Sequence, residues 1–154
     1  MEKPISTLQS KSFLLRMAMP FLFLLGTIHL AVGLLLAWLL VMTLYLEVSL
    51  LKKVFVSPRD LIRSHIDFLM MSLFLFLFSL FFSYLQTEPS FLLKILLTIG
   101  PFGNAAGFLV LAVKPDIEKS IFSFYGILFG LIFTATTLGF CLAIYEISQA
   151  YANH

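Results

Sequence analysis

The chain alternates between long apolar stretches and short polar segments. Four of the stretches carry no charged residue, and each is about as long as a membrane-spanning helix must be. Residues 68–85, the clearest of them, would extend roughly 27 Å as a helix, which is close to the thickness of a bilayer's hydrocarbon core. The pattern therefore predicts an all-α fold, an integral-membrane four-transmembrane-helix bundle that forms a single domain over residues 1–154. The predicted helices lie near residues 17–45, 58–85, 91–113 and 120–145.

Turn and cap residues support these boundaries. Ser57 can cap the second helix, Pro58 suits its first position, and the acidic residue three places after the serine can complete a capping box. A Pro-containing turn at residues 86–90 and a charged loop at residues 114–119 separate the later helices. Ser120 is then expected to cap the last helix.

The first segment is harder to divide. Residues 1–12 are polar and are expected to form a mobile or surface-lying tail. Residues 17–46 are uncharged over about twice the length of a signal-peptide core, so we interpret them as a membrane helix rather than a signal peptide. Residues 41–56 combine leucines with a few charges. They fit either an interfacial amphipathic helix or a continuation of the first helix out of the membrane.

Composition narrows the class of protein. The chain is 60% hydrophobic and 12% charged, about half the charge of a soluble domain. Its net charge is +2 and its basic residues are scattered, so we predict no nucleic-acid partner. Cys141 is the only cysteine, which excludes an intrachain disulfide or a multi-cysteine metal site. Six of the ten Lys and Arg residues fall on the side away from the termini, which favours termini outside the cytoplasm.

Three ionisable residues stand at the mouth of the second predicted helix. Arg63 and Asp67 are four residues apart, share a face and can pair. His65 lies about 200° from either, on a narrow stripe of small residues with Ser72 and Ser79. Such a seam lets a neighbouring helix or a flat ligand approach the backbone. His65 is thus either a ligand to a metal or heme iron, or an interfacial histidine bonded to a carbonyl.

The first helix holds a second candidate histidine. Gly26, His29, Gly33 and Ala37 fall on one face, which places His29 on a small-residue surface. A histidine there is more often structural than a ligand. His29 nevertheless remains the competitor to His65 for any iron.

The third helix is unusual at its centre. Pro101 should kink it, and Asn104 shares a face with Gly100 and Gly107. Asn104 can either bond a neighbouring helix or form part of a pocket. A similar face in the last helix is expected to serve helix packing, and it consists of Gly126, Gly130 and Thr134.

Familiar catalytic motifs are absent from the sequence. It contains no Walker loop, no dinucleotide-binding glycine motif, no paired metal carboxylates and no Ser-His-Asp set. A transporter usually carries more intramembrane charge and internal repeats, so transport is the least favoured interpretation.

The run Ser57–His65, with the pattern S-P-x-x-x-x-R-x-H, resembles the start of the second helix of the styrene oxide isomerase family. These are small bacterial four-helix membrane enzymes. The likeness covers most of the chain at low identity. Weaker matches are Val32-Gly33, then Asn104 with Gly107 and Phe108, and Ile121–Phe124.

The resemblance implies a cofactor and an assembly. It implies heme b bound at the subunit interfaces of a homotrimer in the bacterial inner (cytoplasmic) membrane, with His65 as axial iron ligand. It also implies ferric iron acting as a Lewis acid that isomerises an apolar epoxide to an aldehyde. Arg63, Ser72 and Asn104 are the other residues expected at the cofactor, with Arg63 meeting a heme propionate or Asp67.

The sequence also departs from the family's pattern. By ungapped placement, the family's polar pocket positions hold Met71, Gly100 and Phe108, so we expect little or no styrene oxide isomerase activity. A small apolar ligand remains compatible with the site. Two alternatives stay open: a heme carrier, sensor or redox subunit, and a cofactor-free membrane subunit that assists a larger complex.

Overall fold

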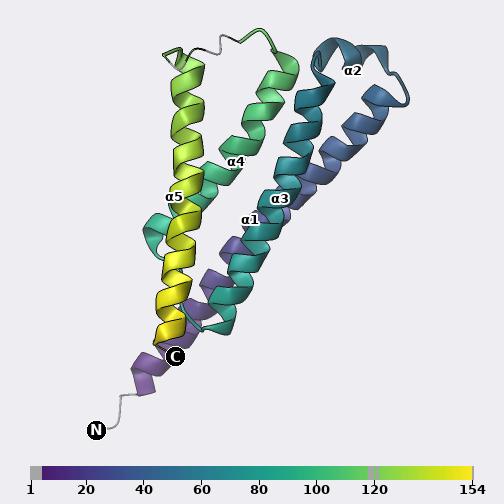
Figure 1. The fold of residues 1–154 in the computed structure, drawn as a ribbon. Coiled ribbons are helices and arrows are strands. Elements are labelled where there is room, and N and C mark those ends of the chain that lie inside the picture. Colours follow the sequence, from purple (N-terminus) through teal and green to yellow (C-terminus); the bar gives the residue numbers. More distant parts are fainter. Residues whose placement is uncertain (1–4, 118–119, 121, 154) are drawn as a thin grey trace.

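The protein is a bundle of long helices, shown in Figure 1 from a computed structural model. The structure describes residues 5–117, 120 and 122–153, and their side chains from residue 21 onward. Over these residues every regular element is a helix, and four helices are long and apolar enough to cross a membrane. The predicted all-α membrane bundle is confirmed. The helices are α1 (Ile5–Leu44), α2 (Ser49–Val54), α3 (Pro58–Tyr84), α4 (Phe91–Val113) and α5 (Phe124–Ala152).

The middle two spans begin and end within one residue of their predicted bounds. At the start of α3, the Ser57 hydroxyl accepts a hydrogen bond from the Asp60 amide, as expected of a helix cap, and donates one to the Asp60 carboxylate. The reciprocal bond of a capping box is not made, because the Ser57 amide donates to the Ala112 carbonyl instead. The last span is longer than predicted and is capped by Ser123, which bonds the amide of Gly126. The expectation that Ser120 caps it was wrong, because the chain turns once more before the helix begins.

The ends of α1 differ from the expectation. α1 begins at Ile5 rather than near residue 17, so residues 5–12 of the expected tail are helical, and residues 1–4 lie outside the described part. α1 ends at Leu44, and Glu47 then adopts a positive φ of 52°, so the first helix does not continue through residues 41–56. The six-residue α2 follows, with no buried residue and a Lys52–Glu47 ion pair of 3.2 Å.

Side chains bonded to carbonyls fix the register of α1 against α3, which run side by side in Figure 1. The Ser72 hydroxyl donates to the Gly26 carbonyl, and the His65 ring bonds the Gly33 carbonyl, each over 2.8 Å. Both partners shift by seven residues from one bond to the next, in opposite directions along the chain. This is the spacing of two antiparallel helices that meet once every two turns.

The same spacing holds α3 against α4. The fully buried Ser64 donates to the Ala105 carbonyl over 2.8 Å, and seven residues earlier the Ser57 amide donates to the Ala112 carbonyl. Interhelical hydrogen bonds of this kind join helices where lipid offers no competing partner. Around them the core forms two apolar clusters. The buried members of the larger one are Leu22, Leu75, Phe78, Phe82, Leu93, Leu97 and Ala143.

Small residues bring α4 against α5. A Cβ on Gly100 would lie 2.6 Å from the Thr136 backbone nitrogen, so the two backbones approach as the glycine face of α4 predicted. The glycine face of α5 behaves differently. Gly130 and Thr134 are exposed, and no atom lies within 4 Å of a Cβ built on Gly130. No described residue packs on that face at Gly130, so the helix packing expected of it stays a prediction.

Candidate functional site

The His65 imidazole is held by the neighbouring helix and remains half-buried. Its Nδ1 lies 2.8 Å from the Gly33 carbonyl oxygen of α1. A carbonyl only accepts hydrogen bonds, so Nδ1 carries a proton, and the tautomer of a neutral ring in this setting has its lone pair on Nε2. Among the described residues, Nε2 has no hydrogen-bond partner. This is the arrangement in which a histidine that binds a metal is usually held.

The seam that continues from His65 is occupied by α1. Ser72 is 2% exposed, and its hydroxyl is bonded to Gly26. Ser79 is buried in the same seam at 7% exposure. The seam was predicted to admit either a neighbouring helix or a flat ligand, and in the structure the helix α1 occupies it. Ser72 therefore serves the contact between α1 and α3.

Arg63 and Asp67 do not pair with each other. The Arg63 guanidinium bonds Asp60 over 3.2 Å and lies 5.8 Å from the centre of the Phe108 ring. Asp67 instead accepts a 2.6 Å hydrogen bond from the side-chain amide of Asn104 on α4. The predicted Arg63–Asp67 pair was wrong because each residue finds a different partner. Arg63 reaches back to Asp60 in the first turn of α3 and lies against Phe108 of α4, and Asp67 bonds Asn104 farther along the same contact.

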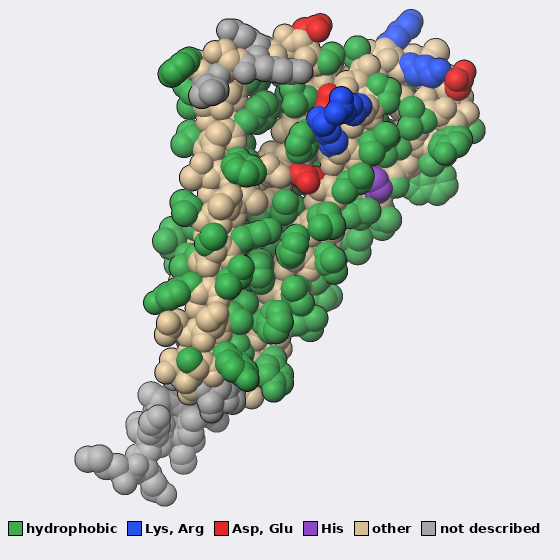
Figure 2. Space-filling model, in the orientation of Figure 1, with side chains coloured by type: hydrophobic (Ala, Val, Ile, Leu, Met, Phe, Trp, Pro, Cys, Tyr) green, Lys and Arg blue, Asp and Glu red, His purple; other side chains and the backbone are tan. Residues whose placement is uncertain are grey.

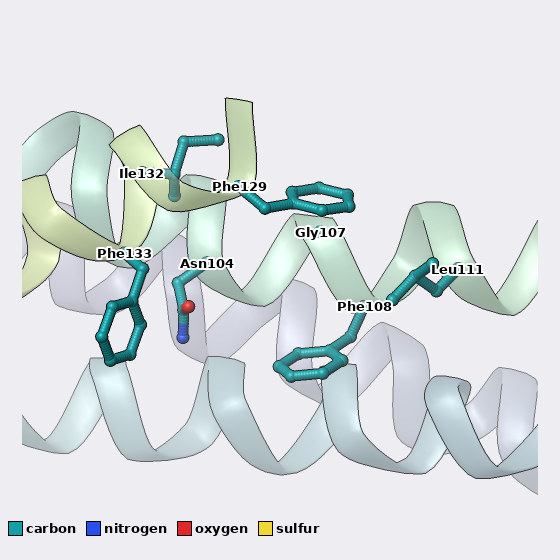
Figure 3. A pocket seen from close by; sticks show the side chains of 7 residues that line it. All are labelled: Asn104, Gly107, Phe108, Leu111, Phe129, Ile132 and Phe133. Carbon is teal, nitrogen blue, oxygen red and sulfur yellow. The ribbon is translucent and has the colours of Figure 1, made fainter. Parts of the chain in front are cut away.

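Asn104 also lines a cavity of about 190 Å³ between α4 and α5. In Figure 3 its side chain lies between the rings of Phe108 and Phe133, with Gly107 leaving space beside Phe129. Both roles expected for Asn104 are thus present, a bond between helices and a place in a pocket. Three phenylalanine rings line the cavity, and the amide is the one polar side chain among its described lining residues.

The four residues expected at the cofactor fall into two groups. His65 and Ser72 lie at the contact between α3 and α1. Arg63 and Asn104 lie at the contact between α3 and α4, where Arg63 meets Phe108 and Asn104 bonds Asp67. The angular separation of His65 from Arg63 along α3 is the cause. Within one chain they therefore form no common site.

His29 has the same tautomer as His65 in a different setting. Its Nδ1 donates to the Leu25 carbonyl of its own helix over 2.8 Å, and its side chain is 1% exposed. Nε2 is buried with no hydrogen-bond partner, and the rings of Phe68 and Phe102 lie 5.7 Å from the imidazole, centre to centre. Thr98 and Phe102 line a groove together with His29, but they were not found from sequence because ordinary threonines and phenylalanines carry no motif.

On the face of the bundle shown in Figure 2, charged side chains gather at one end. Figure 2 shows the Lys and Arg side chains of this face, with some acidic ones, at the end where α2 and the start of α3 lie, and a hydrophobic surface below them. The basic residues in those two elements are Lys52, Lys53, Arg59 and Arg63. A charged end above an apolar band is expected of a helix bundle at a membrane surface.

In the described part of the chain, no three His, Cys, Asp or Glu side chains are placed to hold a metal ion. A heme iron needs only one such side chain, because the porphyrin supplies the other four nitrogen ligands. Comparison with protein families, with characterised proteins and with solved structures finds no match to this chain.

Proposed function

We propose that this integral membrane protein binds heme b, with His65 Nε2 as the axial ligand of the iron. The bond from Nδ1 to the Gly33 carbonyl carries the proposal, since it fixes the ring and leaves Nε2 as a half-buried donor atom. The bond also crosses between helices, so the ring direction is set by the bundle. The resemblance of Ser57–His65 to styrene oxide isomerase points to the same atom.

The remaining residues fit a heme unequally. Arg63 has a side chain that is 47% exposed, and its planar guanidinium suits a propionate if it releases Asp60. Ser72 is closed in between helices, and Asn104 is bonded to Asp67. We therefore keep His65 as ligand and Arg63 as a propionate contact, and we leave Ser72 and Asn104 to packing within the protomer.

Bound ferric heme would supply a Lewis-acidic iron. The chain adds few groups that could orient an epoxide there. Met71 is 9% exposed, Gly100 abuts the Thr136 backbone, and Phe108 lies against Arg63. A misplaced substrate loses orders of magnitude in rate. We therefore propose little or no styrene oxide isomerase activity, and a role as heme carrier, sensor or redox subunit.

An absorption spectrum of the purified protein tests the cofactor. Protein produced with ample heme should show a Soret band that His65→Ala loses. His29→Ala is the matched control, because its imidazole has the same tautomer but is buried. Full heme content in His65→Ala would overturn the assignment. Brisk conversion of styrene oxide to phenylacetaldehyde by the wild-type protein would overturn the claim about activity.

A colourless protein would favour the alternative function, a cofactor-free subunit of a larger complex. In that case His65 would serve only to join α1 to α3. The stability of the His65→Ala protein, measured alongside its spectrum, separates loss of heme from loss of fold. A variant that keeps its helical content and loses only the Soret band supports the proposal.

We further propose that the chain forms a homotrimer in the bacterial inner membrane. Gly130 and Thr134 leave a small-residue strip of α5 uncovered within the chain, which suits close contact with a second helix. The number of chains and the choice of the bacterial inner membrane rest on the resemblance to the styrene oxide isomerase family. Native mass spectrometry from lipid nanodiscs should report three chains, and only monomers at physiological protein-to-lipid ratios would refute the assembly.

A further inference from the structure

The groove beside His29 is separate from the proposed heme site. We propose that it binds an apolar molecule that carries a hydroxyl donor, of the phenol class, and that His29 Nε2 accepts the hydrogen bond. The proposal does not depend on heme. It rests on an acceptor with no partner, on a groove beside it and on the character of the groove's walls.

The acceptor is defined by the tautomer. His29 Nδ1 donates to the Leu25 carbonyl, so Nε2 of the neutral ring has a lone pair and no proton. The atom is buried and has no hydrogen-bond partner among the described residues. Buried polar groups are nearly always paired, so an orphan of this kind calls for an explanation. A ligand hydroxyl would satisfy it.

The groove has the size of a small-molecule site. It is an open groove of about 480 Å³ between α1, α4 and α5, and His29 is one of its lining residues. This volume lies within the usual range for ligand pockets. Its apolar walls are Leu25, Ile28, Ile99, Phe102 and Ile132.

A second polar side chain in the groove shares the preference for a donor. The Thr98 hydroxyl gives its proton to the Lys94 carbonyl over 2.7 Å, so its oxygen is left as an acceptor. No charged residue lines the groove in the described part of the chain. A ligand must therefore be neutral, mostly apolar and equipped with a donor. An alcohol on an aromatic ring meets all three conditions.

Phe102 controls access to the imidazole. Its ring meets the His29 ring at 88° and the Phe68 ring at 74°, and the residue is 44% exposed, so an outward rotation would give up its edge-to-face contact with the imidazole and with Phe68. A flat aromatic ligand could replace this edge-to-face contact while its hydroxyl reaches Nε2. This favours a phenol over an aliphatic alcohol.

The test compares 4-butylphenol with 4-butylanisole, which has nearly the same shape but no donor. Calorimetric titration of the full chain in detergent micelles should show saturable phenol binding, with the anisole about tenfold weaker or worse. Nitrogen NMR of the histidines should show the Nε2 resonance of His29 moving with the phenol. The resonance of His65, which does not line the groove, should stay in place.

Two variants assign the site. His29→Phe should abolish saturable phenol binding, whereas His65→Ala should retain it. If His29→Phe fails to fold, Ile99→Trp serves instead, because it fills the groove from a residue that is 57% exposed. Equal binding of phenol and anisole, or a His29 resonance that does not respond to phenol, would overturn the proposal.

Discussion

The contact between α1 and α3 and the contact between α4 and α5 are both built on glycines, but in different ways. The Gly26 carbonyl accepts the hydrogen bond from Ser72, and the atoms nearest to a Cβ placed on Gly26 belong to the Phe76 ring, at 2.9 Å. Gly100 meets the backbone of Thr136, which cannot move aside without shifting the helix. One contact is held by hydrogen bonds beside movable side chains. In the contact between α4 and α5, the two backbones lie close together because Gly100 has no side chain.

This difference decides how each contact tolerates change. Side-chain ends can rotate, and the loss of one hydrogen bond between membrane helices averages only about 0.6 kcal/mol. Two backbones in contact cannot rotate away from each other, and adding a methyl group to such a packed contact typically costs about 1–3 kcal/mol. The glycine faces therefore look alike in sequence but should respond very differently to the same methyl group.

The largest effect is expected for Gly100→Ala. The new methyl would lie 2.6 Å from the Thr136 nitrogen, so α4 and α5 must separate, at a cost of about 2 kcal/mol or more. An unfolding titration with SDS in mixed micelles measures the loss. Gly130→Ala on α5 is the matched control, since nothing lies near its Cβ. Equal stability of the two variants would remove the distinction between the two contacts.

The contact between α3 and α4 should come next. Asn104→Ala leaves the Asp67 carboxylate without the one hydrogen-bond partner it has among the described residues, which should cost about 1–3 kcal/mol. Asp67→Asn removes the charge and keeps an amide that can still bond Asn104, so its cost should be smaller. The same SDS titration ranks the two. A larger loss in Asp67→Asn would show that the charge itself stabilises the bundle.

Sequence predicted the second and third spans closely because their start signals are local. Ser57 with Pro58, and the Pro-containing turn before α4, mark helix ends through neighbouring residues alone. Partners were harder to predict, because spacing gives a face of a helix and not what covers it. Arg63 had acidic residues both before and after it at helical spacing. Only the fold placed Asn104 beside Asp67 and directed Arg63 elsewhere.

The candidate site shows the same limit. The small-residue stripe below His65 was visible in the sequence, yet a stripe is equally suited to a helix or a ligand. The carbonyl partner of His65 lies 32 residues away in the chain, on a helix whose register is set by bonds at Ser72 and beyond. The orphaned Nε2 of His29 depends on the packing of three aromatic or imidazole rings. Neither property follows from spacing.

A smaller effect is expected for Ser72→Ala. The change removes the 2.8 Å bond to the Gly26 carbonyl and leaves a methyl group in a buried place, at a cost of about 0.6–1 kcal/mol. Ser148→Ala is a control of the same chemistry, because Ser148 is exposed and bonds the Ile144 carbonyl of its own helix. SDS titration should separate the two by most of that amount. Indistinguishable variants would mean that the bonds between α1 and α3 set register without adding stability.

The smallest effect is expected for Gly26→Ala, and its sign sharpens the comparison. The added methyl presses on the Phe76 ring, which can rotate, while alanine favours the helix over glycine by up to about 1 kcal/mol. The two terms should nearly cancel, whereas Gly130→Ala keeps the propensity gain and meets nothing within the chain. Dilute micelles, which hold single chains, should therefore rank Gly130→Ala slightly above wild type and Gly26→Ala near it. If Gly130→Ala instead loses stability only in lipid at high protein density, another copy of the chain covers that face of α5, because the added methyl then clashes with that copy.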